Sequence, residues 1–167
     1  VLLKDIANIK KGQSITKDKI EYGNYPVIAG GQTSPYSSNV FNQEKNVITI
    51  SSSGAYSGYV WYHDYEIFAS DCMAIRSKDE TKYLTKYIFE ILKLKQNEIY
   101  KLQRGSGQPH VYAADISLIS IPAITIEKQN EITKKITDIR YKAKQLKEEG
   151  ETLLEQTKKE IENILIK

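Results

Sequence analysis

A chain of 167 residues with 40% hydrophobic and 27% charged residues has the composition of a folded globular protein, not of a disordered one. Its single cysteine, Cys72, excludes an intrachain disulfide and is typical of a cytoplasmic protein, and no stretch approaches the ~18 apolar residues of a membrane span. The formal net charge of +3 permits nucleic-acid binding but does not require it.

The composition changes near Pro122. Eleven of the twelve tyrosines and eight of the nine glycines precede it, whereas the remainder is rich in Lys, Glu, Ile and Leu. We therefore predict an α+β protein with two parts: a compact mixed α/β body over residues 1–124 and one long C-terminal coiled-coil helix over residues 125–167.

The first half of the body reads as short strands between turns. A helical turn at residues 3–7 is predicted to end at Lys11-Gly12. Apolar and β-branched runs then predict three strands, at residues 25–29, 47–51 and 72–76. Two further runs, at residues 59–62 and 66–69, are separated by His63-Asp64 and are predicted to form the arms of a hairpin.

The second half of the body begins with a predicted helix. Residues 82–97 place Tyr83, Tyr87, Ile91 and Leu94 three or four positions apart, as one face of a helix requires. After a polar loop, residues 115–122 alternate between apolar and polar side chains, which predicts a half-buried strand.

Residues 125–167 carry the most regular pattern in the chain. Four apolar residues recur at every seventh position, from Ile132 to Leu153, and charged residues fill the positions between. The companion position of the repeat holds Ile136, Ala143, Gly150, Thr157 and Ile164, and Thr157 and Glu160 weaken the distal end. The predicted coiled-coil seam consists of Ile132, Ile136, Ile139, Ala143, Leu146, Leu153 and Ile164.

A rod of about 40 residues is about 60 Å long at 1.5 Å per residue. It is too long to bury its seam against so small a body, so the seam predicts a partner helix, and we expect antiparallel pairing. The alternative is a helix that folds back on the body as a hairpin.

Patterns for catalysis and metal binding are weak. The two histidines and the cysteine lack the spacing of zinc ligands. Asp71 followed by Glu80-Thr81-Lys82 loosely resembles the acidic pattern of nucleases, which recurs by chance. Gly105-Ser106-Gly107 begins like a dinucleotide-binding motif, but it lacks the third glycine and follows a helix. We predict no catalytic residue, no metal and no cofactor.

Three polar loops remain, at residues 30–38, 51–59 and 104–112. They supply Gln, Ser, Thr, Arg, His and Tyr side chains that suit base edges, and small residues that let backbone N–H groups approach phosphates. Loops of this composition also occur in any α/β protein, so their chemistry alone leaves the function open.

Several short segments follow one another in a fixed order along the chain: Leu3-x-Asp5-Ile6-x-x-Ile9-x-x-Gly12, Tyr25-Pro26-Val27-Ile28-x-Gly30-Gly31, Val47-Ile48-x-Ile50-Ser51-x-x-Gly54 with Gly58-Tyr59-Val60, Phe68-Ala69-Ser70-Asp71-Cys72, Leu84 with Tyr87, Gly105-Ser106-Gly107-Gln108-Pro109, Ile119-x-Ile121-Pro122 and Glu127-x-Gln129-x-x-Ile132. Each is weak alone. The ordered set covers essentially the whole chain and resembles the specificity (S) subunits of type I restriction–modification systems.

The resemblance implies that the body is a target-recognition domain reading one half of a split site in double-stranded DNA. It implies that the helix is a spacer, and that methylation and cleavage come from separate methyltransferase (M) and restriction (R) subunits. Complete S subunits carry two such units in tandem, whereas this chain carries one. We therefore expect a half-subunit that forms a homodimer, or an isolated half that needs its tandem partner.

With that function, the loop chemistry gives candidate DNA contacts. The candidates for phosphate contacts are Lys10, Lys11, Lys101 and Arg104. The candidates for base-edge or groove contacts are Gln32, Thr33, Tyr36, Ser53, Tyr56, Gln108 and His110.

Two other interpretations keep the chain non-catalytic. It could be the specificity portion of a fused restriction–methyltransferase enzyme, or a coiled-coil scaffold whose body binds protein. The scaffold interpretation predicts dimers that have no affinity for DNA. An enzyme, the third possibility, would show turnover of its substrate by the purified chain without other subunits.

Overall fold

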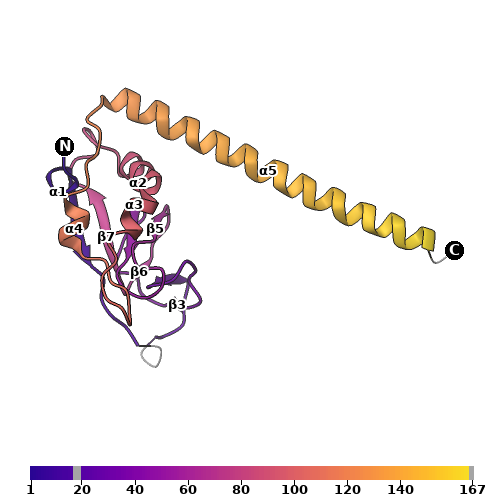
Figure 1. The fold of residues 1–167 in the computed structure, drawn as a ribbon, viewed down its shortest axis with the longest axis horizontal. Coiled ribbons are helices and arrows are strands. Elements are labelled where there is room, and N and C mark those ends of the chain that lie inside the picture. Colours follow the sequence, from indigo (N-terminus) through magenta and orange to yellow (C-terminus); the bar gives the residue numbers. More distant parts are fainter. Residues whose placement is uncertain (17–19, 166–167) are drawn as a thin grey trace. The chain divides into compact units, whose positions relative to one another are not determined.

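The computed structural model describes residues 1–16 and 20–165 and divides into two compact units, Val1–Asn130 and Glu131–Lys167 (Figure 1). The first unit combines two β-sheets with short helices, and the second is formed by most of one long helix. The mixed body and the long helix agree with the predicted α+β class.

A four-stranded antiparallel sheet forms the centre of the first unit. Its strand order is β1-β7-β4-β5, and its strands are β1 (Ala7–Lys11), β7 (Cys72–Ser77), β4 (Val47–Ser51) and β5 (Val60–His63). A three-stranded sheet has the order β3-β2-β6, with β3 (Ser37–Ser38), β2 (Tyr25–Ile28) and β6 (Phe68–Ala69). The strands predicted at residues 25–29, 47–51 and 72–76 are confirmed.

The predicted hairpin of residues 59–62 and 66–69 is wrong. β5 pairs with β4 over four residue pairs, from Val47↔His63 to Ile50↔Val60, while β6 lies parallel to β2 in the other sheet. The short spacing between the two runs does not select a partner. The burial of apolar side chains selects β2 as the partner of β6, because Ile67 and Ala69 pack in one apolar cluster with Ile28 of β2.

The predicted continuation of the first helix to Gly12 is also wrong. α1 (Leu3–Ile6) buries Leu3 and Ile6 and ends at once, since Ala7 is extended with φ −133° and ψ 150°. Residues 7–11 form β1 and pair with β7 in five positions. This pairing satisfies the backbone groups of a strand edge that would otherwise be open.

Two elements of the second half differ from their predictions. The helix predicted at residues 82–97 is interrupted at Lys95, so that α2 (Thr85–Leu94) and α3 (Gln96–Tyr100) follow each other. The predicted strand at 115–122 is wrong: α4 (Ala113–Ser117) occupies its start. Its later residues run beside the N-terminus, where Ile121 N donates to Val1 O (2.9 Å).

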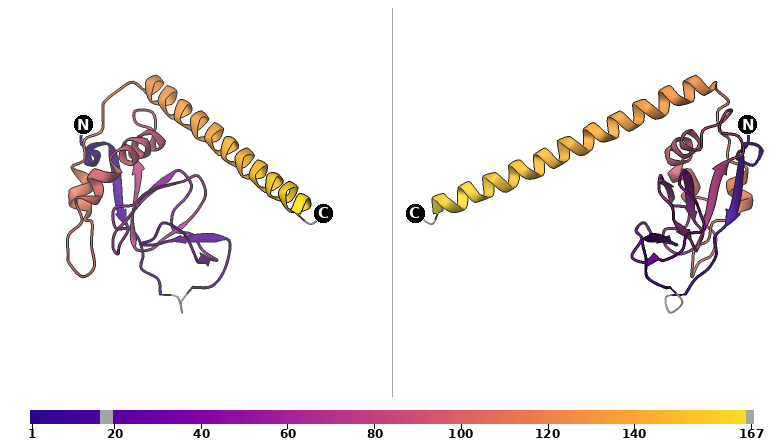
Figure 2. Two further views of the ribbon diagram at one scale, coloured as in Figure 1. Left: turned by 45° about the vertical axis from the view of Figure 1, so that its right-hand side comes forward. Right: turned by 180° about the vertical axis from the view of Figure 1, so that it is seen from behind.

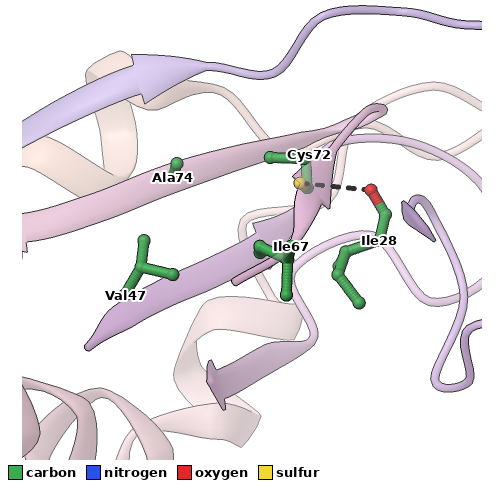
Figure 3. Close-up of a cluster of buried hydrophobic side chains, with 6 residues drawn as sticks. Ile28, Val47, Ile67, Cys72 and Ala74 are labelled. Carbon is green, nitrogen blue, oxygen red and sulfur yellow. Dashed lines mark hydrogen bonds between the residues drawn. The ribbon is translucent and has the colours of Figure 1, made fainter. Parts of the chain in front are cut away.

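The four-stranded sheet is covered on both faces. On one face α2 buries Tyr87, Ile88 and Leu92, and the Tyr62 and Phe89 rings lie 5.4 Å apart. On the other face a buried cluster joins the two sheets (Figure 3). Its members are Ile28, Val47, Ile67, Ala69, Cys72 and Ala74.

The thiol of Cys72, the cysteine in this cluster, is unreactive at neutral pH. Cys72 Sγ donates to Ile28 O (3.5 Å), and burial raises the pKa of its thiol to about 12. Because the thiolate is the reactive form, Cys72 is a packing residue at neutral pH.

α5 (Ile126–Leu165) is one uninterrupted helix that includes Gly150, as predicted. Ile132 and Ile136 are half-buried, and the other seam residues are exposed: Ile139, Ala143, Leu146, Leu153 and Ile164. Within the described ranges, no helix combines the length and the apolar character needed to cross a membrane.

Candidate nucleic-acid interface

The register of the central sheet gathers three strand ends at one place. Lys11 at the end of β1 pairs with Met73, and Ser51 at the end of β4 pairs with Cys72 at the start of β7. The segments that continue from these ends therefore share one end of the sheet, opposite the N-terminus (Figure 2). Gly12 is required there, since a Cβ on it would lie 2.0 Å from Ser70 O.

The loop at residues 51–59 is tightly closed on itself. Gly58 N donates to Ser51 O (2.7 Å), and Ser57 N donates to Gly54 O (2.9 Å). Gly54 and Gly58 have positive φ values of 83° and 90°, in the left-handed region that glycine adopts without strain. Tyr56 lies between these glycines and is 47% exposed.

Side chains from the α2–α3 region hold this loop from behind. Gln103 Nε2 donates to Ser57 O (2.7 Å). Gln96 Nε2 donates to Gly58 O (2.8 Å), and its Oε1 accepts from Val60 N (2.9 Å). The side-chain amides of Gln96 and Gln103 thus hydrogen-bond to the loop backbone and fix it from one side. The opposite, outward side of the loop remains accessible to a partner.

The third loop is fastened to the second through backbone bonds. Gly54 N donates to Pro109 O (3.0 Å), and Val111 N donates to Ser52 O (3.0 Å). The base of the third loop is closed by reciprocal bonds between Arg104 and His110, of 2.9 and 2.8 Å.

The first loop meets the second at a glycine. A Cβ on Gly30 would lie 2.7 Å from Ser53 O, so the two backbones are in contact there. Ser53 Oγ donates a hydrogen bond to Asp71 Oδ2, and Ser52 N donates to Asp71 O (3.2 Å). The three loops therefore form one continuous surface, here called the loop surface (residues 30–38, 51–59 and 104–112).

The structure brings most of the predicted DNA contacts to the loop surface. The exposed ones are Gln32, Thr33, Tyr56 and Gln108, and the half-buried ones are Tyr36, Ser53 and His110. Lys11 is exposed at the same end of the sheet, and Lys101 is exposed just after α3. Which of these residues touch DNA stays a prediction.

Two predicted phosphate contacts have distinct surroundings. Arg104 forms an ion pair with Asp115 (2.8 Å) and lies over the Tyr112 ring at 5.9 Å, although its side chain remains 65% exposed. Lys10 lies apart from the loops, on the face of the central sheet beside Ala74 and Arg76.

Sequence reasoning missed the residues that hold the loops. Gln96 and Gln103 lie in or after a helix and carry no local signal of a loop contact. The nuclease-like pattern and the family resemblance both include Asp71, but neither predicts that its carboxylate accepts from Ser53 Oγ and its backbone oxygen from Ser52 N. The Gly-x-x-x-Gly spacing of Gly54 and Gly58 was the one available sign of a rigid turn.

The histidine of β5, His63, is buried and is not part of the loop surface. His63 is 0% exposed, and Thr49 Oγ1 lies 2.8 Å from its Nε2. Burial lowers the pKa of His63 to about 4, against the opposing effect of Asp64. Among residues 1–16 and 20–165, no three His, Cys, Asp or Glu side chains cluster as metal ligands would.

Comparison with solved structures shows a shared fold. The chain matches the crystal structure of a type I restriction–modification system S subunit from M. genitalium with a TM-score of 0.75 and 23% identity, covering 84% of this chain and 38% of that one. It matches the HsdS subunit from Thermoanaerobacter tengcongensis with a TM-score of 0.65 and 18% identity, covering 85% and 37%.

A third match, to a structure described as underlying complex assembly and conformational transition of the type I R-M system, has a TM-score of 0.69 and 18% identity and covers 87% of this chain and 39% of that one. The chain thus spans about two fifths of the length of each matched structure. No curated protein matches it.

The family comparison covers nearly the whole sequence. Residues 1–163 match the family model described as the type I restriction modification DNA specificity domain. This family match gives no support to the interpretation of the chain as a coiled-coil scaffold. The chain belongs to the family of type I restriction–modification DNA specificity domains.

Proposed function

We propose that the body reads one half of a split DNA site, through the loop surface, as the specificity component of a type I restriction–modification system. The observation that carries this proposal is that backbone bonds and side-chain amides hold the second and third loops together, with the first loop in contact with them at Gly30. A rigid surface with exposed polar side chains suits base reading, because recognition groups held in place lose little entropy on binding.

Positioning and reading fall to different side chains in this proposal. Lys11, Lys101 and Arg104 contact phosphates and make binding weaker as salt rises. The base-edge candidates of the loop surface supply the discrimination, and four of them are exposed: Gln32, Thr33, Tyr56 and Gln108. A good base contact is worth about 1–3 kcal/mol against the wrong base.

The chain itself is proposed to be non-catalytic and to act in the cytoplasm. Methylation and cleavage are assigned to M and R subunits that the specificity component holds on DNA. The inert thiol of Cys72 and the buried, neutral imidazole of His63 are in keeping with this assignment.

α5 is proposed to pair with a second helix of the same kind, from an identical chain or a tandem copy. Leu146 and Leu153 are 59% and 63% exposed in the single chain, and burying such side chains provides about 25 cal/mol per Å² of apolar surface. Pairing would hold two reading surfaces at a fixed spacing, matching two half-sites in the DNA.

Selection from a DNA library with a random centre tests the reading function. The purified chain is expected to enrich two inverted half-sites if it dimerises, or a single half-site if it acts alone. Tyr56→Ala should then weaken binding to the selected site about 5- to 150-fold, which corresponds to about 1–3 kcal/mol. Tyr141→Ala, on an exposed turn of α5 and outside the seam, is the matched control.

Library selection is repeated with the M subunit present, because the complex is the working form. Enrichment in neither arm contradicts the reading function. Equal loss of affinity on selected and unrelated DNA would assign Tyr56 to positioning and contradict its role as a base reader.

Sedimentation equilibrium tests the helix pairing separately. Leu146→Glu and Leu153→Glu should dissociate a homodimer into monomers, because each buries a charge in the seam. Glu155→Gln, outside the seam, should leave the dimer intact. A monomeric parent chain would contradict homodimerisation and leave the tandem arrangement.

A further inference from the structure

A small pocket opens on the face of the central sheet, at the edge of the buried cluster that joins the two sheets. It has a volume of about 80 Å³ and is lined by Asn8, Lys10, Gln43, Val47, Ala74 and Arg76. Figure 3 shows Val47 and Ala74 at one end of the cluster, with Ile28 and Cys72 at the other. The apolar side chains of the three-stranded sheet therefore do not fill this corner.

The register of β1 and β7 explains the hollow. Asn8 pairs with Arg76, and Lys10 pairs with Ala74. Cross-strand partners point to the same face of a sheet, as do residues two apart in one strand. The polar side chains of Asn8, Lys10 and Arg76 thus surround the methyl group of Ala74, which is too short to fill the space between them.

The charges around the pocket are of one sign. Lys10 and Arg76 are cationic, and none of the lining residues carries a carboxylate. Arg76 is held in place by two main-chain acceptors: its Nη1 donates to Lys45 O (3.0 Å) and its Nη2 to Glu44 O (2.8 Å). These bonds fix the guanidinium without neutralising it.

The remaining polar side chains of the pocket are free to bind. Within residues 1–16 and 20–165, the side chains of Asn8, Lys10 and Gln43 make no hydrogen bond or ion pair. Two amides and an ammonium group without partners, beside a fixed guanidinium, are suited to an anion with several acceptor oxygens.

The size of the pocket limits the ligand. A water molecule takes about 30 Å³ in the liquid, so 80 Å³ holds about two or three waters. Sites for drug-sized ligands and cofactors are commonly about 300–1,000 Å³. The space fits a tetrahedral oxyanion and excludes a whole nucleotide.

We propose that this pocket binds a phosphate group through Lys10, Arg76 and the amides of Asn8 and Gln43. When DNA is bound, the group is a phosphate of the DNA backbone, and this second statement rests on the proposed function. The pocket extends the predicted contact of Lys10 into a site of four side chains, three of which sequence reasoning did not single out. The same chemistry would also accept free inorganic phosphate.

The first arm of the test uses inorganic phosphate alone. Backbone amide signals of the 167-residue chain are followed by NMR as phosphate replaces chloride at constant ionic strength. Saturable shifts are expected at Asn8–Lys11 and at Ala74–Arg76. Asn8→Asp, which places a negative charge in the pocket at nearly constant volume, should weaken phosphate binding at least tenfold, whereas Lys82→Gln, outside the pocket, should not change it.

The second arm measures DNA affinity against salt concentration. Each lost phosphate contact lowers the slope of log K against log salt by about 0.9 for duplex DNA. Lys10→Gln should lower the slope by about one such unit, and Lys82→Gln should leave it unchanged. Circular dichroism of each variant checks that the fold is retained.

The two arms separate the possible outcomes. Phosphate shifts with a lowered DNA slope support the pocket and identify the source as DNA. Phosphate shifts with an unchanged DNA slope support the pocket with free phosphate as its ligand. Phosphate shifts in a chain that binds no DNA, either alone or with the M subunit present, support the pocket and contradict the proposed function. DNA binding with no phosphate shifts and no effect of Lys10→Gln or Asn8→Asp overturns the pocket.

Discussion

Replacing Gln129 by alanine should destabilise the body by about 3 kcal/mol, on the basis of about 1 kcal/mol for each of three hydrogen bonds. Gln129 is 0% exposed. Its Oε1 accepts from Leu84 N (2.9 Å), and its Nε2 donates to Lys82 O (2.8 Å) and Ile124 O (3.0 Å). The variant leaves these three backbone groups without the amide that satisfies them.

Thermal unfolding followed by circular dichroism measures the effect. For a domain of this size, a loss of 3 kcal/mol lowers Tm by about 10 °C. Gln145→Ala, which removes an exposed contact with Tyr141 on the same helix, should change the free energy of unfolding by no more than about 0.5 kcal/mol. Equal Tm values for the two variants would refute the reasoning, because they would mean that the buried amide contributes no more than an exposed one.

Three further predictions concern the body. Burial holds the pKa of His63 near 4 in the folded state, against 6.5 in the unfolded state. Between these pH values the unfolded state therefore binds a proton at His63 and the folded state does not. Stability should therefore be unaffected by His63 above pH 6.5 and fall as pH drops from 6.5 to 4, by up to about 1.4 kcal/mol per pH unit; His63→Phe should remove this slope in urea titrations, and an unchanged slope contradicts the assignment. Gly30→Ala should weaken DNA binding by displacing the backbone of residues 51–59, whereas Gly107→Ala, with no atom within 4 Å of its Cβ, should not, as fluorescence anisotropy would show. Gln103→Leu should cost about 1 kcal/mol in urea unfolding and increase hydrogen exchange at Ser57, and unchanged exchange would argue against the clamp.

Local patterns were enough to predict several elements of the fold. Strands β2, β4 and β7 follow from apolar and β-branched runs, and α5 follows from its seven-residue repeat. In each case the signal lies within the segment itself, so neighbouring elements do not have to be known.

Errors arose where a distant segment decides the structure. Residues 7–11 form a strand because they pair with the edge of β7. β6 pairs with β2 and not with β5, because its residues pack in an apolar cluster with Ile28. Residues 113–117 become a helix even though the following alternation resembles a strand. Neither β7 nor Ile28 is adjacent in sequence to the segment whose structure it decides.

Much the same division applies to the candidate site. Composition pointed to the three loops, and the sheet register brings them together. The composition of the sequence could not show that Gln96 and Gln103 hold residues 51–59, or that Lys10 lies beside Arg76. These relations depend on side chains separated by dozens of positions, for which a single sequence carries no pattern.

The backbone fastening of the loops has a consequence for how specificity changes. Residues 51–59 are held through main-chain oxygens and nitrogens and by two glycines, and the exposed Tyr56 lies between these glycines. Under the proposed function, mutations at these positions alter the DNA sequence that is bound while the backbone of the loop keeps its conformation. Under the proposed function, the DNA target of this chain can be changed by randomising Gln32, Thr33, Tyr56 and Gln108 while Gly30, Gly54, Gly58, Gln96 and Gln103 are kept.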